Sequence, residues 1–124
     1  MNLFGMLGAL FGFLGVALGA FGAHGLKDRL TPEDLQIFET GVRYQMYHAL
    51  ALLLVAVLLS KGANSLQVVS GWAFSLGILV FSGSLYLMVL TGHRLLGAVT
   101  PLGGVAFLVG WGALAWSFLQ LRGG

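Results

Sequence analysis

Residues Leu3 to Ala23 have the sequence LFGMLGALFGFLGVALGAFGA, an unbroken run of 21 apolar and small residues. At a rise of about 1.5 Å per residue, a helix of this length reaches about 31 Å and crosses a hydrocarbon core of about 30 Å. The run has no basic segment before it and is longer than the apolar part of a usual signal peptide. We therefore expect a first transmembrane helix that is not cleaved.

Three further apolar stretches of the chain are long enough to cross a membrane. The composition agrees, because 58% of the 124 residues are hydrophobic and only 8% are charged, which is typical of a membrane protein and not of a soluble domain. We predict an all-α membrane protein with one transmembrane domain, residues 1–124, and four transmembrane helices in a left-handed bundle. The expected spans are residues 3–23, 44–60, 68–90 and 101–121.

Helix start and stop signals support these limits. Thr31-Pro32 and Thr100-Pro101 each place a capping hydroxyl before a proline, whose missing N–H costs nothing in the first turn. Gly92 is suited to a left-handed helix C-terminus. Acidic residues follow Pro32, and apolar residues then recur at helical spacing. We expect a short interfacial helix over residues 32–43 that leads into the second span.

The orientation follows from the basic residues that flank the spans. Four spans place both termini on one side of the membrane and connections one and three on the other. The connection side holds four basic residues and the terminal side two, namely Lys27, Arg29, Arg43 and Arg94 against Lys61 and Arg122. The positive-inside rule then predicts cytoplasmic connections and termini on the periplasmic or extracellular side.

Small residues recur along the first and last spans with steps of three or four. They are Gly5, Gly8, Gly12, Gly15, Gly19 and Gly22 in the first span, and Gly103 and Gly110 in the fourth. Such residues let helices approach closely in lipid, and a repeat near 3.5 residues favours left-handed packing. We expect these glycines to pack the four helices together. The alternative is a homo-oligomer that associates through the glycine face.

Most polar chemistry is expected at one end of the bundle. His24 ends the first span, His48 follows Tyr44 and Gln45 by about one turn, and His93 lies in the third connection. An ionisable group inside a span usually faces the bundle or a cavity. We expect Tyr44, Gln45 and His48 at the bundle mouth, where His24 meets them. The full candidate cluster is His24, Glu39, Arg43, Tyr44, Gln45, His48 and His93, in which Glu39 and Arg43 form an i,i+4 pair.

The three histidines raise the question of a metal site. His24, His48 and His93 could bind zinc or move protons, but they are far apart in sequence and no metal-binding motif surrounds them. A histidine that satisfies a hydrogen-bond network between helix ends is the preferred interpretation. We expect no cofactor, and the sequence shows no catalytic signature, so an enzymatic activity is not expected.

Charge and cysteine content narrow the partners. A net charge of +2 gives no basic surface suited to nucleic acid. Because the chain has no cysteine, disulfides, thiolate chemistry and lipid anchors on cysteine are excluded. The expected partners are membrane lipids, with a second copy or another membrane protein as further candidates.

Four segments resemble the transmembrane protein 256-like family, also catalogued as domain of unknown function 423. They are GAFGAHGL at 19–26, FETGVRYQMYHAL at 38–50, FSGSLY at 81–86 and TPLGG at 100–104. The resemblance implies a small multi-span protein of bacterial inner membranes and brings no established activity. The matching polar and glycine positions are His24, Tyr44, Gln45, His48, Gly83, Ser84, Tyr86, Thr100 and Pro101.

Three functional hypotheses follow. The leading one is a non-enzymatic membrane bundle that acts through protein or lipid contacts, in an accessory or assembly role. The second is an oligomeric channel or facilitator for a small solute, with Tyr44, Gln45 and His48 at its mouth. The third is a metal-binding membrane protein built on the three histidines.

Overall fold

The chain forms four long helices that run up and down the molecule. The computed structural model describes residues 2–123, with side chains described up to residue 120. Helix α1 (Leu3–Phe21) continues into the π-helical η1 (Gly22–Leu26) and is followed by α2 (Pro32–Leu59). The third span joins α3 (Ser65–Gly77), the π-helical η2 (Ile78–Ser82) and α4 (Gly83–Thr91). After the 3₁₀ helix η3 (Arg94–Ala98), α5 (Thr100–Gly123) completes the bundle.

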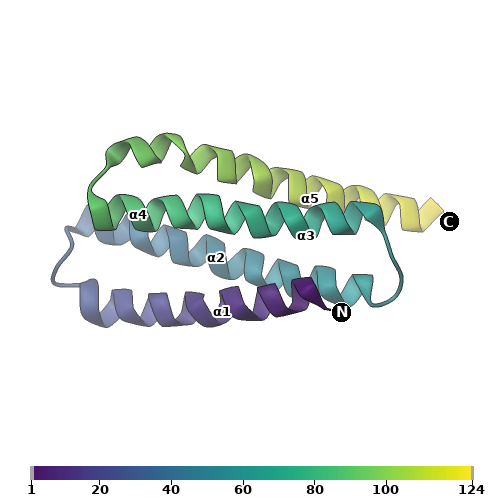
Figure 1. Cartoon of the computed structure of the whole chain (residues 1–124), viewed down its shortest axis with the longest axis horizontal. Coiled ribbons are helices and arrows are strands. Elements are labelled where there is room, and N and C mark those ends of the chain that lie inside the picture. The colour runs from purple at the N-terminus through teal and green to yellow at the C-terminus, as the bar shows by residue number, and fades with distance from the viewer. Residues whose placement is uncertain (1, 124) are drawn as a thin grey trace.

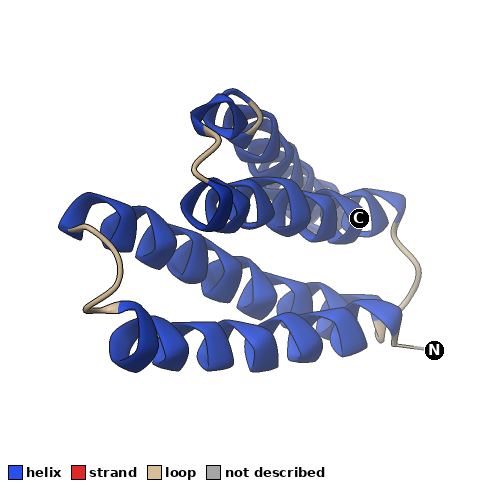
Figure 2. Cartoon of the chain, turned by 60° about the vertical axis from the view of Figure 1, so that its left-hand side comes forward, coloured by secondary structure: helices blue, strands red, loops and turns tan. Residues whose placement is uncertain are grey.

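Long helices that follow one another in the chain run antiparallel, as Figure 1 shows. Both termini and the α2–α3 connection lie at one end, and the α1–α2 and α4–α5 connections lie at the other. The bundle consists of two helix pairs, α1 with α2 and α3 with α5 (Figure 2). All four segments are long and apolar enough to cross a membrane, which confirms the predicted fold class.

The helix ends show which start and stop signals work as predicted. Thr31 caps α2, since its Oγ1 accepts a hydrogen bond from the Asp34 N–H at 3.1 Å, with Pro32 in the first turn. Gly92 ends α4 in the left-handed conformation, with φ 77°. Thr100 differs from the prediction, because it lies inside the first turn of α5. Its hydroxyl instead pairs with that of Ser84 at 2.6 Å and so ties α5 to α4.

The predicted interfacial helix over residues 32–43 is not a separate element. These residues form the first turns of α2, which continues without a break to Leu59. Gly41, the residue most able to interrupt the helix, instead makes room for a neighbour, because a Cβ there would lie 2.7 Å from the Tyr86 ring. The result is one helix of 28 residues, about 42 Å long.

Glycines bring α1 against α2 along most of its length. A Cβ on Gly8 would lie 2.8 Å from the backbone oxygen of Ala49, and one on Gly15 would lie 2.5 Å from the Met46 sulfur. A Cβ on Gly22 would meet the Phe38 ring at 2.8 Å. Gly5 and Gly19 approach α2 less closely. Apart from Gly12, the glycines of this face therefore pack against α2 within the chain.

Two glycines of α5 likewise allow close packing against the third span. A Cβ on Gly103 would overlap the backbone of Phe81, and one on Gly110 would lie 2.6 Å from the Phe74 ring. Phe74 is fully buried, together with Leu52 and Val55 of α2. These three side chains fill the centre of the bundle, where the two helix pairs meet.

Gly8 and Gly12 provide a direct test of this packing. Gly12 lies one turn after Gly8 on the predicted seam, yet nothing lies within 4 Å of a Cβ built on it. We expect Gly8→Ala to lower the free energy of unfolding by about 1–3 kcal/mol, because the Ala49 carbonyl cannot move aside without separating the helices. Gly12→Ala should be neutral or stabilising by up to about 1 kcal/mol. Thermal unfolding in detergent, followed by circular dichroism, measures both, and equal effects would contradict the packing.

Candidate functional site

Gln45 links three helices through its side-chain amide. Its Nε2 donates a hydrogen bond to the backbone oxygen of Phe11 in α1 at 2.8 Å. The Tyr86 hydroxyl in α4 donates to its Oε1 at 2.6 Å. Because the Phe11 carbonyl only accepts, the amide has one orientation that satisfies both contacts. Gln45 is only 3% exposed, so α2 holds a polar bridge inside the bundle.

A second polar contact supports this bridge. Ser82, the last residue of the π-helical η2, donates from its Oγ to the backbone oxygen of Gly41 at 2.6 Å. The third span is therefore held to α2 by Tyr86 and Ser82 one turn apart.

His48 forms a separate contact, with α5. Its Nδ1 lies 2.7 Å from the backbone oxygen of Tyr44, and the Trp111 Nε1–H donates to its Nε2 at 3.0 Å. A carbonyl accepts and an indole N–H donates, so both contacts are satisfied only by neutral imidazole with its proton on Nδ1. The His48 ring also stacks on Phe107, with centroids 3.6 Å apart and an interplanar angle of 6°.

The predicted position of these residues at the bundle mouth is not what the structure has. Gln45 lies close to the midpoint of α2, and its partner Phe11 lies well inside the first span, Leu3–Leu26. Trp111 is likewise near the middle of α5. The physical reason is that α2 begins at Pro32, so three turns of helix precede Tyr44. The polar bridge lies deep within the bundle.

The other members of the predicted cluster lie elsewhere. His24 in η1 and His93 before η3 are exposed, and no hydrogen bond joins either side chain to His48 in the described structure. Glu39 and Arg43 form the expected pair at 3.7 Å, with both side chains at least half exposed. The structure thus brings Tyr44 and His48 together, with their rings stacked. Gln45 instead bonds to α1 and α4, and neither of the other histidines joins these residues.

The geometry gives no support to a metal centre. Among residues 2–123 no group of three or more histidine and acidic side chains is placed to hold a metal ion. Both ring nitrogens of His48 have partners within the chain, Nε2 with the Trp111 N–H and Nδ1 with the Tyr44 backbone oxygen.

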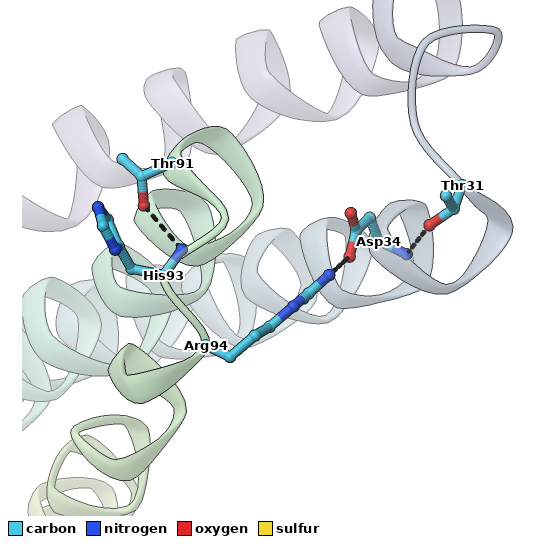
Figure 3. A network of polar contacts seen from close by, with 5 residues as sticks. All are labelled: Thr31, Asp34, Thr91, His93 and Arg94. Carbon is cyan, nitrogen blue, oxygen red and sulfur yellow. Dashed lines mark hydrogen bonds and ion pairs between the residues drawn. The ribbon is translucent and has the colours of Figure 1, made fainter.

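The connections at one end of the bundle are tied by an ion pair that the sequence analysis missed. Arg94 Nη2 lies 2.8 Å from Asp34 Oδ1, so η3 contacts the first turn of α2 (Figure 3). Thr31 accepts from the Asp34 N–H, and Thr91 accepts from the His93 N–H at 3.3 Å in the same view. Residues 34 and 94 are sixty positions apart, so no local pattern indicates their contact.

Trp111 and Phe107 are the other residues that sequence reasoning missed. Both lie in a run of α5 that has no polar pattern, and each contacts His48 only because α5 packs beside α2. Tyr86 and Ser84, by contrast, were matching positions of the family resemblance, and both have hydrogen-bond partners in other helices.

Two grooves on the sides of the bundle adjoin these polar contacts. The α1–α4 groove, about 470 Å³, opens between α1 and the third span, and Gln45, Ser82 and Tyr86 contribute to its lining. The α2–α5 groove, about 420 Å³, is lined by aromatic residues that include Tyr44, Phe107 and Trp111, together with His48. The remaining lining of both grooves is almost wholly apolar.

These features define a class of protein, a four-helix membrane bundle whose internal polar side chains form hydrogen bonds to other side chains and to the backbone. Comparison with known proteins agrees with that class. A family model described as "Protein of unknown function (DUF423)" matches residues 18–104. The chain therefore belongs to this family, as its motifs indicated.

Two relatives show how far the similarity extends. The chain is 50% identical over 113 residues to the UPF0382 membrane protein YwdK of Bacillus subtilis, which covers 90% of this chain and 91% of the relative. It is 46% identical over 124 residues to a UPF0382 membrane protein of Staphylococcus epidermidis, covering 99% of this chain and 100% of the relative. No solved structure matches the chain significantly.

The His48–Trp111 hydrogen bond leads to a second prediction. We expect Trp111→Phe to lower the free energy of unfolding by about 1–3 kcal/mol, because it leaves the Nε2 lone pair of His48 without a donor inside the bundle. Trp72→Phe is the control, since Trp72 is similarly exposed and contacts Phe4 through its ring edge. Chemical unfolding in detergent measures both variants. If Trp111→Phe unfolds no more easily than Trp72→Phe, the hydrogen bond does not stabilise the bundle.

Proposed function

We propose that this protein is a non-enzymatic membrane bundle that acts through contacts with lipids or other membrane proteins, in an accessory or assembly role. The proposal rests on the difference between the polar groups inside the bundle and the apolar surface outside it. Every buried side-chain nitrogen and oxygen in the described structure has a hydrogen-bond partner, whereas large apolar side chains and grooves lie on the outer faces. The outer surface is what remains free for recognition.

The state of His48 supports a role without catalysis. A histidine that acts as base, acid or metal ligand needs a ring nitrogen available to its substrate. Both ring nitrogens of His48 are engaged within the chain. The side chain therefore suits the joining of α2 to α5 better than it suits chemistry.

The packing at the centre of the bundle favours a role in protein or lipid contacts over a role as a channel for a small solute. Leu52, Val55 and Phe74 have no exposed surface and occupy the region through which a central path would run. A facilitator would then have to form between several copies, and the observed glycine seams are used inside one copy.

The proposal also includes the membrane in which the protein lies and its orientation in that membrane. We place it in the bacterial inner membrane, with the connection that contains Lys27 and Arg29 and the connection that contains Arg94 on the cytoplasmic side. The Asp34–Arg94 ion pair then lies at the cytoplasmic surface, where water and headgroups can reach it.

Native mass spectrometry of protein released directly from membranes tests the proposed function. We expect a reproducible protein partner or an enriched lipid, because the free surface is the outer one. A four-span protein of another family, expressed to the same level, is the control for lipids retained at random. A lone monomer that carries lipids in bulk proportion would contradict the proposal.

The orientation has its own test, which the absence of natural cysteine makes simple. Ala63, in the α2–α3 connection, and Leu95, in η3, are both exposed. In intact cells we expect Ala63→Cys to react with a membrane-impermeant maleimide and Leu95→Cys to react only after permeabilisation. Labelling of Leu95→Cys alone in intact cells would reverse the orientation.

A further inference from the structure

The bundle contains two separate apolar cores. The larger core takes side chains from all four spans, among them Leu52 and Phe74. The smaller one, here called the connection-end core, has three buried members, Leu26, Phe38 and Val89. They lie near the end of the bundle that holds the α1–α2 and α4–α5 connections. A region with few buried apolar contacts opens at a lower free energy than a large core does.

Hydrogen bonds between spans separate the two cores. Four of them, all from side chains, join Gln45 to Phe11, Gln45 to Tyr86, Ser82 to Gly41 and Ser84 to Thr100. Along α2, Gln45 falls between Val42, which packs on the connection-end core, and Ala49 of the larger core. The apolar packing is therefore interrupted at this level, and the two cores are not one continuous unit.

The backbone of the third span is irregular at the same level. The π-helical η2 ends at Ser82, and Gly83 follows as the first residue of α4. Nothing lies within 4 Å of a Cβ built on Gly83, so no close approach of another helix within the chain requires a glycine there. Helices bend most readily at glycines and at π-helical turns. The third span thus has a natural hinge between the two cores.

The Asp34–Arg94 ion pair lies beyond the connection-end core and holds the moving side of this hinge. Arg94 reaches from η3 to the first turn of α2, where its Nη2 lies 2.8 Å from Asp34 Oδ1 (Figure 3). Of the two ion pairs among residues 2–120, it is the one that joins different helices. Because η3 has no buried residue of its own, this contact is what fastens the α4–α5 connection to α2.

The ion pair is placed where salt can act on it. Helix α2 is about 42 Å long, longer than a hydrocarbon core of about 30 Å, and Glu33, Asp34, Glu39 and Arg43 all lie in its first turns. This end of α2 therefore stands among headgroups and water. The Arg94 side chain is 58% exposed and that of Asp34 is 17% exposed, so dissolved ions screen their attraction.

We propose that the Asp34–Arg94 ion pair is a salt-sensitive latch on a conformational device built into the bundle. When the latch is closed, α4 and η3 lie against α2 and cover the connection-end core. When it is released, α4 and η3 swing away about Gly83, and the connection-end core meets water while the larger core stays packed. The latch goes beyond the proposed function, because it identifies the part of the bundle that changes shape.

Thiol labelling of the full chain in lipid nanodiscs tests the latch, since the natural sequence has no cysteine. Val89→Cys reports on the connection-end core, and a water-soluble maleimide reacts with its thiol only when the core opens to water. We expect slow labelling with the latch intact. Adding Arg94→Gln should speed labelling about three- to tenfold, because loss of the ion pair raises the population of the open form.

Two controls separate release of the latch from other effects. Arg43→Gln is the matched variant, because the Arg43 side chain is also 58% exposed and its ion pair with Glu39 lies within α2. It removes the same charge and should leave labelling of Val89→Cys unchanged. Val55→Cys reports on the larger core, where Val55 has no exposed surface, and Arg94→Gln should not speed its labelling.

Salt and a double variant examine the ion pair itself. Raising NaCl to about 1 M, which shortens the screening length to about 3 Å, should speed labelling of Val89→Cys in the otherwise natural chain and have little effect with Arg94→Gln. Asp34→Asn combined with Arg94→Gln should label no faster than Arg94→Gln alone, because both changes break one contact. If Val89→Cys does not fold, Leu26→Cys is the second reporter of the same core.

Three outcomes would overturn the latch. Equal labelling with Arg94→Gln and Arg43→Gln would show that the ion pair does not hold the connection end closed. Faster labelling of Val55→Cys together with Val89→Cys would show that the bundle opens as one unit. Labelling of Val89→Cys that is indifferent to salt would leave the latch without its proposed control.

Discussion

A polar side chain inside a membrane bundle has to find its hydrogen-bond partners within the protein, and Gln45 meets this constraint by joining three helices. Its amide donates to α1 and accepts from α4, so α2 cannot rotate about its axis without breaking both contacts. Ser82 adds a third contact to α2 at Gly41. Because lipid offers no replacement partners, these hydrogen bonds set the register of α2 against its neighbours.

The glycines make this register possible. The 2.8 Å hydrogen bond from Gln45 of α2 to the backbone of α1 requires the two helices to lie very close, and Gly8 and Gly15 remove the side chains that would separate them. Gly103 and Gly110 do the same for α5 against the third span. Close packing substitutes in the membrane for the hydrophobic driving force that water would supply. The space left over lies in grooves at the outer faces of the bundle.

The same division between the interior and the exterior of the bundle underlies the proposed function. Interior polar groups bond to other parts of the chain and hold the helices together, and both ring nitrogens of His48 are engaged in this way. In the proposed function, recognition takes place at the outside of the bundle. Gln45 supports the bundle through its amide and is also one of the residues that line the α1–α4 groove.

The sequence by itself determined the four helices, the cap at Thr31, the stop at Gly92 and the family, because these depend on local composition, local hydrogen bonds and motifs. It also identified Gln45 and His48 as polar residues within a span. Only the tertiary structure decided that Gln45 bonds to Phe11, that His48 bonds to Trp111, that Arg94 pairs with Asp34, and that His24 stays apart. Each of these depends on which helix faces lie together. The bonded residues are 34 to 63 positions apart in the chain, so no local pattern indicates that they meet. A repeat of glycines shows that another helix can pack closely at that face. Only the assembled bundle shows which helix does so.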